Sequence, residues 1–269
     1  MSKNPNIAVV GATGLVGRTM TKVLEQRKFP LRSLQLYASE RSAGETIKFQ
    51  DSEITVQKLD KNSFDDADIA LFSAGGSVSK KYAPIAAEKN CVVVDNSSAW
   101  RMDDGIPLVV PEVNGETLKD HKNIIANPNC STIQLVAAVK PIFDKYGIHR
   151  LVCSTYQSIS GAGQKGVDKL LNEIKGETNE DKHSIAYNTM FHPLSHADGF
   201  TTEENKMWNE TRKILNRKHM NIAITCVRLP ILGGHGESVN LELEKEFKIS
   251  DIRELLSNTK GLVVIDDMI

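Results

Sequence analysis

The chain has 269 residues, enough for two domains at roughly 100–200 residues each. Hydrophobic residues make up 40% and charged residues 25% of the sequence, which excludes a disordered chain, a collagen and a coiled coil. The 33 basic and 34 acidic side chains leave a net charge of −1, which argues against nucleic acid as a partner, and no apolar stretch is long enough for a membrane span.

The first 130 residues alternate strand-like and helix-like segments. The predicted strands cover residues 6–10, 34–38, 67–73, 91–94 and 124–126, and the predicted helices cover residues 15–27 and 77–89. This alternation is typical of a doubly wound parallel sheet, whose right-handed crossovers bring every strand's carboxyl end to one edge. We therefore expect an α/β cofactor domain of Rossmann type over residues 1–127.

The pattern changes after residue 127. We predict helices over 131–146, 166–174 and 201–216, a strand over 150–158, a polar loop over 178–199, and two mutually paired strands over 222–229 and 238–247. The third helix begins with a capping pattern formed by Thr201 and Glu204. Because the strands are longer and the crossovers fewer, we expect a second, α+β domain over residues 128–269.

Glycines 11, 14 and 17 follow the first strand as G-x-x-G-x-x-G, a variant of the dinucleotide-binding fingerprint. Gly11 permits the tight turn, Gly14 lets a pyrophosphate approach, and Gly17 lets the helix pack on the sheet. The amides of residues 13–16 would then face the phosphates from the helix N-terminus. The alternative is a glycine-rich turn without a ligand.

The residues after the second strand indicate which nucleotide binds. Ser39, Arg41 and Ser42 can hold a 2′-phosphate, which favours NADP. Glu40 supports the competing interpretation, because a carboxylate there favours NAD, and a solvated surface loop is the third possibility.

Cys130 lies in Asn-Pro-Asn-Cys-Ser-Thr over residues 127–132, where a strand gives way to a helix. The helix dipole and the free amides stabilise a thiolate there, and the same amides can serve an oxyanion. The alternative for a cysteine is a buried side chain that packs in the core and has no chemical role. Cys91, Cys153 and Cys226 fit this alternative because they lie in apolar strands. The wide spacing, without C-x-x-C, favours a reducing cytoplasm and predicts no metal site.

A thiolate needs a partner for proton transfer, and His235 is the candidate. It lies between glycines in Gly-Gly-His-Gly-Glu over residues 233–237, which allows close approach of a substrate. A simple turn histidine is the alternative. His183, His192 and His196 could line a cleft, but nothing in the sequence fixes them.

Six motifs in order make the chain similar to aspartate-semialdehyde dehydrogenases over essentially its whole length. They are residues 11–17 (GATGLVG), 38–44 (ASERSAG), 95–101 (DNSSAWR), 127–132 (NPNCST), 156–163 (YQSISGAG), and 226–230 (CVRLP) leading into 234–237 (GHGE). The resemblance implies interconversion of 4-phospho-L-aspartate and L-aspartate 4-semialdehyde plus phosphate, with NADP and a cysteine thioester. It places the protein in lysine (diaminopimelate), methionine and threonine biosynthesis, as a homodimer or homotetramer built through its second, catalytic and dimerisation domain.

The resemblance also implies a role for individual residues. Cys130 would be the nucleophile and His235 the acid/base; Gln157, Arg228 and Glu203 would bind the acyl group, α-carboxylate and ammonium; Arg101 and Lys206 would bind phosphate. The cofactor contacts would be Gly11, Thr13, Gly14, Leu15, Val16, Ser39, Arg41, Ser42, Ser160 and Gly161. Arg101 could instead pair with Asp103, and Lys206 could be a solvated helix charge.

Two departures from the family pattern stand out. Gly236 follows the histidine where the family usually has serine, threonine or alanine, and it is still small. Family members continue for some tens of residues past the point matching Ile269, with further sheet and a helix that returns to the cofactor domain. We expect this C-terminal segment to be absent from the chain. The catalytic activity of the chain then depends on whether turnover requires that segment.

Three other functions compete with this interpretation. N-acetyl-γ-glutamyl-phosphate reductase shares the fold and cysteine chemistry, but the spacing of Arg228 and His235 and the helix with Glu203 and Lys206 favour the aspartyl enzyme. A catalytically inactive NADP-binding or assembly module would fit a truncated chain. A glyceraldehyde-phosphate-type dehydrogenase is weakened by the surroundings of Cys130.

Overall fold

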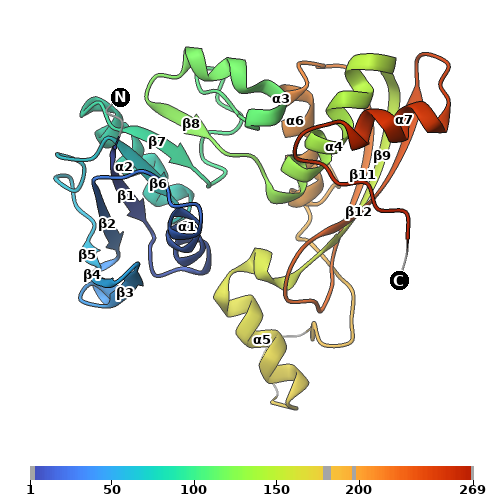
Figure 1. The fold of residues 1–269 in the computed structure, drawn as a ribbon. Coiled ribbons are helices and arrows are strands. Elements are labelled where there is room, and N and C mark those ends of the chain that lie inside the picture. Colours follow the sequence, from blue (N-terminus) through green and yellow to red (C-terminus); the bar gives the residue numbers. More distant parts are fainter. Residues whose placement is uncertain (1–3, 178–182, 196–197, 268–269) are drawn as a thin grey trace. The chain divides into compact units, whose positions relative to one another are not determined.

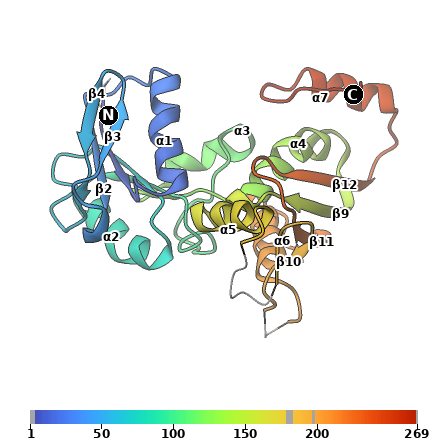
Figure 2. The same cartoon turned by 90° about the horizontal axis from the view of Figure 1, so that it is seen from below.

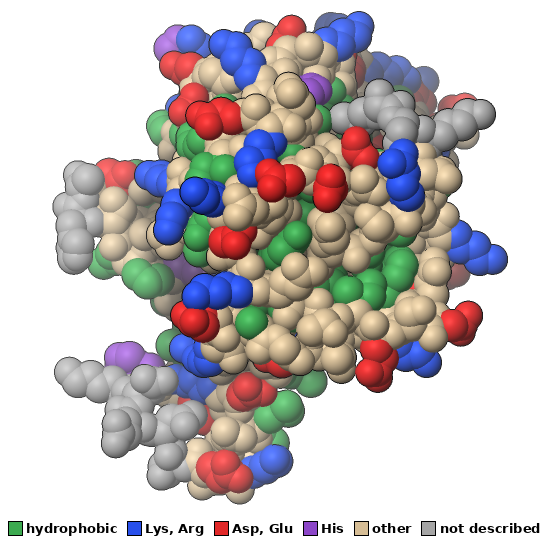
Figure 3. Space-filling view, turned by 90° about the vertical axis from the view of Figure 1, so that its left-hand side faces the viewer, with side chains coloured by type: hydrophobic (Ala, Val, Ile, Leu, Met, Phe, Trp, Pro, Cys, Tyr) green, Lys and Arg blue, Asp and Glu red, His purple; other side chains and the backbone are tan. Residues whose placement is uncertain are grey.

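The computed structural model describes residues 4–177, 183–195 and 198–267. The chain forms two compact units, the first comprising Met1–Val109 with Glu116–Pro128 and the second Val110–Gly115 with Asn129–Ile269. Figures 1 and 2 show the elements of each unit, and on the face in Figure 3 basic and acidic side chains are interspersed. Among the described residues, no helix has the length and apolarity needed to cross a bilayer.

The first unit is built on a six-stranded sheet in which every pairing is parallel. Its strands, in spatial order, are β5 (Gln57–Lys58), β2 (Ser33–Ala38), β1 (Asn6–Val10), β6 (Ile69–Phe72), β7 (Val92–Asp95) and β8 (Ile124–Ala126). A small hairpin of β3 (Thr46–Phe49) and β4 (Ser52–Thr55) follows β2. The predicted parallel sheet is confirmed, while β3, β4 and β5 were not predicted.

Helices cover both faces of this sheet because its strands alternate between two cores. Ile7 and Val9 lie in a core that includes Leu24 of α1 (Leu15–Gln26), whereas Ala8 and Val10 lie in a core that includes Ala83 of α2 (Gly76–Glu88). Figure 2 shows the two helices on opposite sides of the strands. The predicted doubly wound arrangement is therefore confirmed.

The second unit has a four-stranded sheet in the order β10 (Met190–Phe191), β11 (Asn221–Arg228), β9 (Ile148–Gln157) and β12 (Gly236–Leu243). Its helices are α3 (Pro111–Asn114), α4 (Cys130–Tyr146), α5 (Gln164–Ile174), α6 (Thr202–Ile214) and α7 (Ile249–Ser257). The sheet is mixed, because β11 runs parallel to β9 while β12 and β10 are antiparallel to their neighbours. This confirms the predicted α+β class, although α7 was not predicted.

One predicted pairing is wrong. The segments 222–229 and 238–247 were expected to pair with each other, but β11 and β12 both pair with β9, which lies between them. A pattern of alternating residues identifies a strand without identifying its neighbour, and the ten-residue β9 is long enough to form a ladder on each side. The predicted loop 178–199 contains the short β10, and its residues 178–182 and 196–197 lie outside the described residues.

Candidate active site

Cys130 is the first residue of α4, and its side chain is exposed. Asn129 caps the helix, and its Oδ1 accepts hydrogen bonds from the Ser131 amide at 3.0 Å and the Thr132 amide at 3.3 Å. Cys91, Cys153 and Cys226 are buried, and burial raises the pKa of each of their thiols to about 12. Cys130 is therefore the one thiol of the four that a substrate can reach directly.

The N-cap engages the amides of residues 131–133 in this structure. The amides of Ser131 and Thr132 donate to the Asn129 side chain, and that of Ile133 donates to the Asn129 carbonyl. A role for the helix start toward an oxyanion stays a prediction. The helix dipole at Cys130 is unaffected by this capping and still favours a thiolate.

His235 lies beside the cysteine. Its Nε2 atom is 3.1 Å from the Cys130 Sγ atom, although 105 residues separate the two in the chain. Gly234, with a φ of +74°, turns the chain just before the histidine and β12 begins just after it. The predicted pair of thiol and imidazole is thus within hydrogen-bond distance in the second unit.

Ser158 holds the other side of the imidazole ring. Its backbone N–H donates to the His235 Nδ1 atom at 3.0 Å, and its hydroxyl lies 3.2 Å from the same atom. An amide can only donate, so Nδ1 is an acceptor and the proton of the neutral ring is on Nε2, facing the sulfur. Burial lowers the pKa of His235, and the nearby Arg228 guanidinium adds to this effect, which favours the neutral ring near pH 7.

Glu203 is the centre of a buried polar cluster next to the cysteine. Its Oε1 atom accepts from Asn129 Nδ2 at 2.7 Å and from Gln157 Nε2 at 3.4 Å, and its Oε2 atom accepts from Lys206 Nζ at 3.0 Å. Burial by itself would raise the pKa of Glu203, but the Lys206 ammonium and the hydrogen bond from Asn129 outweigh it and the pKa is lowered. The carboxylate is therefore ionised at neutral pH.

Gln157 connects this cluster to the nucleophile helix. It is the last residue of β9 and is almost fully buried, and its Nε2 atom donates to the Ser131 hydroxyl at 3.1 Å. Ser131 directly follows Cys130 in α4. The predicted substrate residues Gln157 and Glu203 are therefore brought together with Cys130 by side-chain hydrogen bonds.

Arg228 lies at the end of β11, and its Nη1 atom donates to the Ser158 carbonyl at 2.8 Å. A Cβ atom added at Gly161 would lie 3.0 Å from Arg228 Nη1 and 3.8 Å from His235 Cε1, so Gly161 packs closely against both side chains. Arginine remains charged in proteins even when burial lowers its pKa, as it does here. The guanidinium offers a fixed cationic fork beside the histidine.

Two residues that sequence reasoning did not place belong to the same region. His192 follows β10, which pairs with β11 at Arg228, and its pKa is lowered by burial and by the charges of Arg228 and Lys206 despite the opposing charge of Glu203. Glu210 accepts a 2.6 Å hydrogen bond from the backbone N–H of Asn129 and is buried. The seven-residue spacing of Glu203 and Glu210 on α6 was an available signal for the second of them.

The glycine turn of the first unit has the predicted backbone. Gly11 has a φ of +83°, and a Cβ atom there would lie 2.5 Å from the Ser73 carbonyl oxygen. A Cβ atom at Gly17 would lie 2.2 Å from the Gly11 carbonyl oxygen, so α1 can approach β1 only through a glycine. A Cβ atom at Gly14 would lie 3.4 Å from the Gly11 oxygen, which is van der Waals contact rather than a clash.

The predicted nucleotide-selecting residues lie on a short 3₁₀ helix, Glu40–Ser42. Ser39 and Arg41 are exposed, and Glu40, the alternative NAD-type carboxylate, pairs with Lys58 at 2.9 Å. Arg101 is also in the first unit, where it is buried and donates to the carbonyls of Asn96 and Asn127. Ser160 and Gly161 lie in the second unit, within the 3₁₀ helix Ile159–Ala162.

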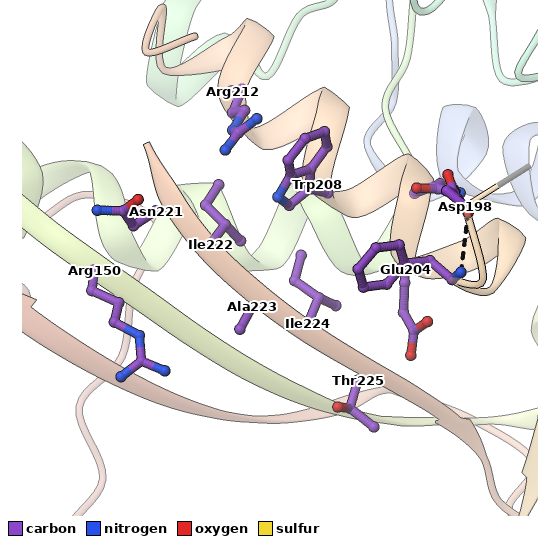
Figure 4. Close-up of a pocket in the computed structure, with 12 residues that line it drawn as sticks. Arg150, Asp198, Glu204, Trp208, Arg212, Asn221, Ile222, Ala223, Ile224 and Thr225 are labelled. Atoms are coloured by element: carbon purple, nitrogen blue, oxygen red, sulfur yellow. Dashed lines mark hydrogen bonds between the residues drawn. The ribbon is translucent and has the colours of Figure 1, made fainter. Parts of the chain in front are cut away.

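A separate cavity of about 610 Å³ lies between α6 and β11. Figure 4 shows Trp208 and Arg212 of the helix over Ile222 and Ile224 of the strand, with the Arg212 guanidinium carbon 3.6 Å from the centre of the Trp208 ring. None of the predicted site residues lines this cavity. The described residues also contain no cluster of three or more His, Cys, Asp or Glu side chains that could hold a metal ion.

Comparisons with known proteins place this arrangement in a family. The family model "Semialdehyde dehydrogenase, NAD binding domain" matches residues 6–121, and "Semialdehyde dehydrogenase, dimerisation domain" matches residues 139–268. Aspartate-semialdehyde dehydrogenase of Aquifex aeolicus (strain VF5) is 54% identical, over 97% of this chain and 80% of the relative. The chain belongs to the aspartate-semialdehyde dehydrogenase family.

Solved structures of aspartate-semialdehyde dehydrogenases share the fold. The crystal structure of aspartate semialdehyde dehydrogenase II complexed with ASA from Vibrio cholerae gives a TM-score of 0.92 at 46% identity, covering 97% of this chain and 80% of that one. The aspartate semialdehyde dehydrogenase with NADP from Candida albicans gives 0.73 at 26% identity, covering 95% and 76%. The resemblance found in the sequence is thus confirmed, and the chain is an oxidoreductase of amino-acid biosynthesis with an NAD-binding first domain.

Proposed function

We propose that this member of the aspartate-semialdehyde dehydrogenase family interconverts 4-phospho-L-aspartate and L-aspartate 4-semialdehyde plus phosphate, with NADP as cofactor, in lysine, methionine and threonine biosynthesis. The observation that carries the proposal is the 3.1 Å approach of His235 Nε2 to the exposed Cys130 Sγ atom. An exposed thiol at a helix N-terminus, paired with an imidazole, is suited to covalent acyl transfer.

In the biosynthetic direction, the Cys130 thiolate attacks the acyl carbon of the acyl phosphate. The carbon–sulfur bond forms, the bond to the phosphate oxygen breaks, and phosphate leaves with both electrons, so that a thioester remains on the cysteine. The hydrogen bond from His235 Nε2 favours the thiolate before the attack. Gln157, which Ser131 and Glu203 hold in position, would bind the acyl group, the role that the resemblance implies.

The cofactor, when bound, supplies the hydride that reduces the thioester. His235 handles the protons that accompany this step, because its Nε2 atom faces the sulfur. Ser158, which bonds to the other ring nitrogen, also bonds to the Ser160 hydroxyl at 2.8 Å, and this contact helps to hold Ser158 beside the imidazole.

Charge complementarity assigns a binding residue to each of the remaining charged groups of the substrate. Arg228 offers a planar fork for the α-carboxylate, and Glu203 offers a carboxylate for the α-ammonium. Lys206, which is paired with Glu203 in this structure, would exchange that contact for the phosphate. Arg101 is the other phosphate ligand that the resemblance implies. A substrate that carries both an ammonium and a phosphate would therefore replace the ion pair between Glu203 and Lys206 with one ion pair to each side chain. Neither side chain would be left without a counter-charge.

The first unit fits an NADP cofactor. Gly14 is the N-cap of α1 and has no side chain to cap the helix, and the first turn has no acidic residue, so Thr13, Leu15 and Val16 could present amides to a pyrophosphate. Arg41, with Ser39 and Ser42, would hold the 2′-phosphate. Lys58 offsets the charge of Glu40 and so weakens the alternative choice of NAD. Ser160 and Gly161 are the other cofactor contacts that the resemblance implies.

The proposal is tested by assaying the purified chain for phosphate-dependent oxidation of L-aspartate 4-semialdehyde with NADP⁺ and with NAD⁺. We expect turnover that requires phosphate and is faster with NADP⁺. The corresponding N-acetylglutamate semialdehyde is the matched control, and faster turnover of that compound would favour N-acetyl-γ-glutamyl-phosphate reductase instead. The absence of turnover on both substrates would favour an inactive binding module.

Arg41→Ala should raise KM for NADP⁺ about tenfold while KM for NAD⁺ stays within about twofold, because only NADP⁺ carries the phosphate that this guanidinium would bind. Steady-state kinetics with both cofactors measure the effect. Arg32→Ala, an exposed arginine just before β2, is the control for loss of a positive charge. Equal weakening of both cofactors would contradict the role of Arg41.

We further propose a cytoplasmic homodimer or homotetramer. The match of residues 139–268 to a dimerisation domain supports association, and the apolar Trp208, Phe200 and Ile224 around the cavity in Figure 4 lie within that range. Four cysteines without a disulfide fit a reducing compartment. A small-molecule substrate and phosphate are the expected ligands.

A further inference from the structure

Glu210 is a buried carboxyl group that the proposed mechanism does not use. It lies on α6 and is only 1% exposed, and its Oε2 atom accepts a hydrogen bond from the backbone N–H of Asn129 at 2.6 Å. The two residues are 81 positions apart in the chain. A buried N–H that loses such an acceptor is left unsatisfied, which is costly, so this contact fixes the main chain at Asn129.

The side chain of Asn129 is bound from the same helix. Its Nδ2 atom donates to Glu203 Oε1 at 2.7 Å, and its Oδ1 atom caps α4 by accepting from the amides of Ser131 and Thr132. Glu203 and Glu210 are seven residues apart on α6, close to two helical turns, so they project from one face. One carboxyl of α6 therefore binds the side chain of the N-cap residue, and the other binds its main chain.

The main-chain contact lies at a junction in the chain. The chain passes from the first unit to the second between Pro128 and Asn129, and Glu210 accepts from the N–H of that peptide bond. Cys130 comes directly afterwards, as the first residue of α4. The contact with Glu210 thus fixes the second unit at the residue where α4 is about to begin.

The partner of the thiol is held by a different element. The backbone N–H of Ser158 donates to His235 Nδ1 at 3.0 Å, and this bond does not involve α4. The Cys130 Sγ atom lies 3.1 Å from His235 Nε2, a distance at which a small displacement weakens a hydrogen bond steeply. A shift at the start of α4 would therefore separate the two groups directly.

We propose that Glu210 is a positioning residue for the nucleophile: by binding the main chain of Asn129 it fixes the start of α4, and with it the contact between the Cys130 thiol and the His235 imidazole. The proposal rests on the proposed function of these two groups. The role requires an acceptor oxygen of the right reach. Glutamine keeps that oxygen at the same length, whereas aspartate keeps the carboxyl but is one methylene shorter.

The test measures the alkylation rate of Cys130 by iodoacetamide, located by peptide mass spectrometry, together with kcat and KM for the semialdehyde. We expect Glu210→Ala and Glu210→Asp each to lower the alkylation rate and kcat about tenfold, because the imidazole and the helix start no longer favour the thiolate fully. KM should stay within about twofold, since Glu203 and Arg228 remain. Glu210→Gln should keep both rates within about twofold of the parent.

Glu173→Ala is the matched control. The Glu173 carboxyl also accepts backbone amides in the second unit, those of Ile185 at 2.8 Å and Ala186 at 2.9 Å. It lies on α5 and makes these bonds to the segment after that helix, not to the nucleophile helix. We expect this variant to lose stability in thermal unfolding and to keep the alkylation rate within about twofold.

Alkylation at the parent rate in both Glu210→Ala and Glu210→Asp would overturn the proposal. A rate kept by the aspartate variant and lost by the glutamine variant would overturn it too, because charge and not the hydrogen bond would then matter. An equal loss in Glu173→Ala would show general loosening instead. If Glu210→Ala does not fold, the other two variants still decide. Alkylation needs no substrate, so a parent protein without turnover would refute the proposed function while the alkylation rates still judge the positioning role.

Discussion

Cys130→Ser should lower phosphate-dependent reduction of NADP⁺ by about a thousandfold or more, because a hydroxyl does not ionise near neutral pH and His235 is a weak base in its buried position. The fold should be unaffected, with a free energy of unfolding within about 0.5 kcal/mol of the parent, because the Cys130 side chain is exposed. Absorbance at 340 nm measures the rate, and thermal unfolding measures the stability.

The matched control for this variant is Cys91→Ala, which removes a buried thiol from the first unit. We expect it to cost some stability and to keep the turnover. If Cys130→Ser retained near-normal turnover, the assignment of the nucleophile would be wrong, and with it the thioester. A loss of turnover accompanied by unfolding would instead point to a structural role for the thiol.

Glu203→Ala should have the largest effect on stability, lowering the free energy of unfolding by about 2 kcal/mol at pH 7. The substitution leaves the Asn129 amide and the Lys206 ammonium without their shared acceptor, and the usual cost of breaking a buried pair is reduced here because Lys206 is partly exposed. Substrate binding should weaken as well. Urea unfolding and KM for the semialdehyde measure the two effects.

The pH dependence of this loss follows from the lowered pKa of Glu203. The ionised group stabilises the fold, so its contribution is complete above the ordinary pKa of 4.5 and disappears as the pH falls through the lower pKa of the folded state. The parent and Glu203→Ala should therefore differ at pH 7 and converge in acid. A difference that stayed constant down to pH 3 would show that packing, not charge, accounts for the loss. Glu242→Gln serves as the exposed control.

The sequence predicted those features that depend on local patterns. The capping pair Thr201 and Glu204 forms both of its reciprocal hydrogen bonds at the start of α6, and α1 and α4 lie where periodicity placed them. The paired Cys130 and His235 were found because each sits in an unusual local setting. Short polar strands such as β4 carry too little periodicity to be distinguished from loops.

What the sequence could not predict depends on contacts between distant segments. The position of His192 follows from the pairing of β10 with β11, which no local pattern specifies. The use of the first-turn amides by Asn129 depends on the rotamer of one side chain. The error in pairing β11 with β12 has the same origin, because strand order in a mixed sheet is decided by packing across the whole second unit.

The central place of β9 has a consequence for how the protein acquires its reactivity during synthesis. The strand that follows His235 can dock on β9 only after residues 236–243 have left the ribosome, more than a hundred residues after Cys130. Until then the nascent chain carries the thiol without its imidazole. Such late closure is slow, because a long loop must be ordered first. A cell would thereby be spared an activated sulfur on an unfinished polypeptide.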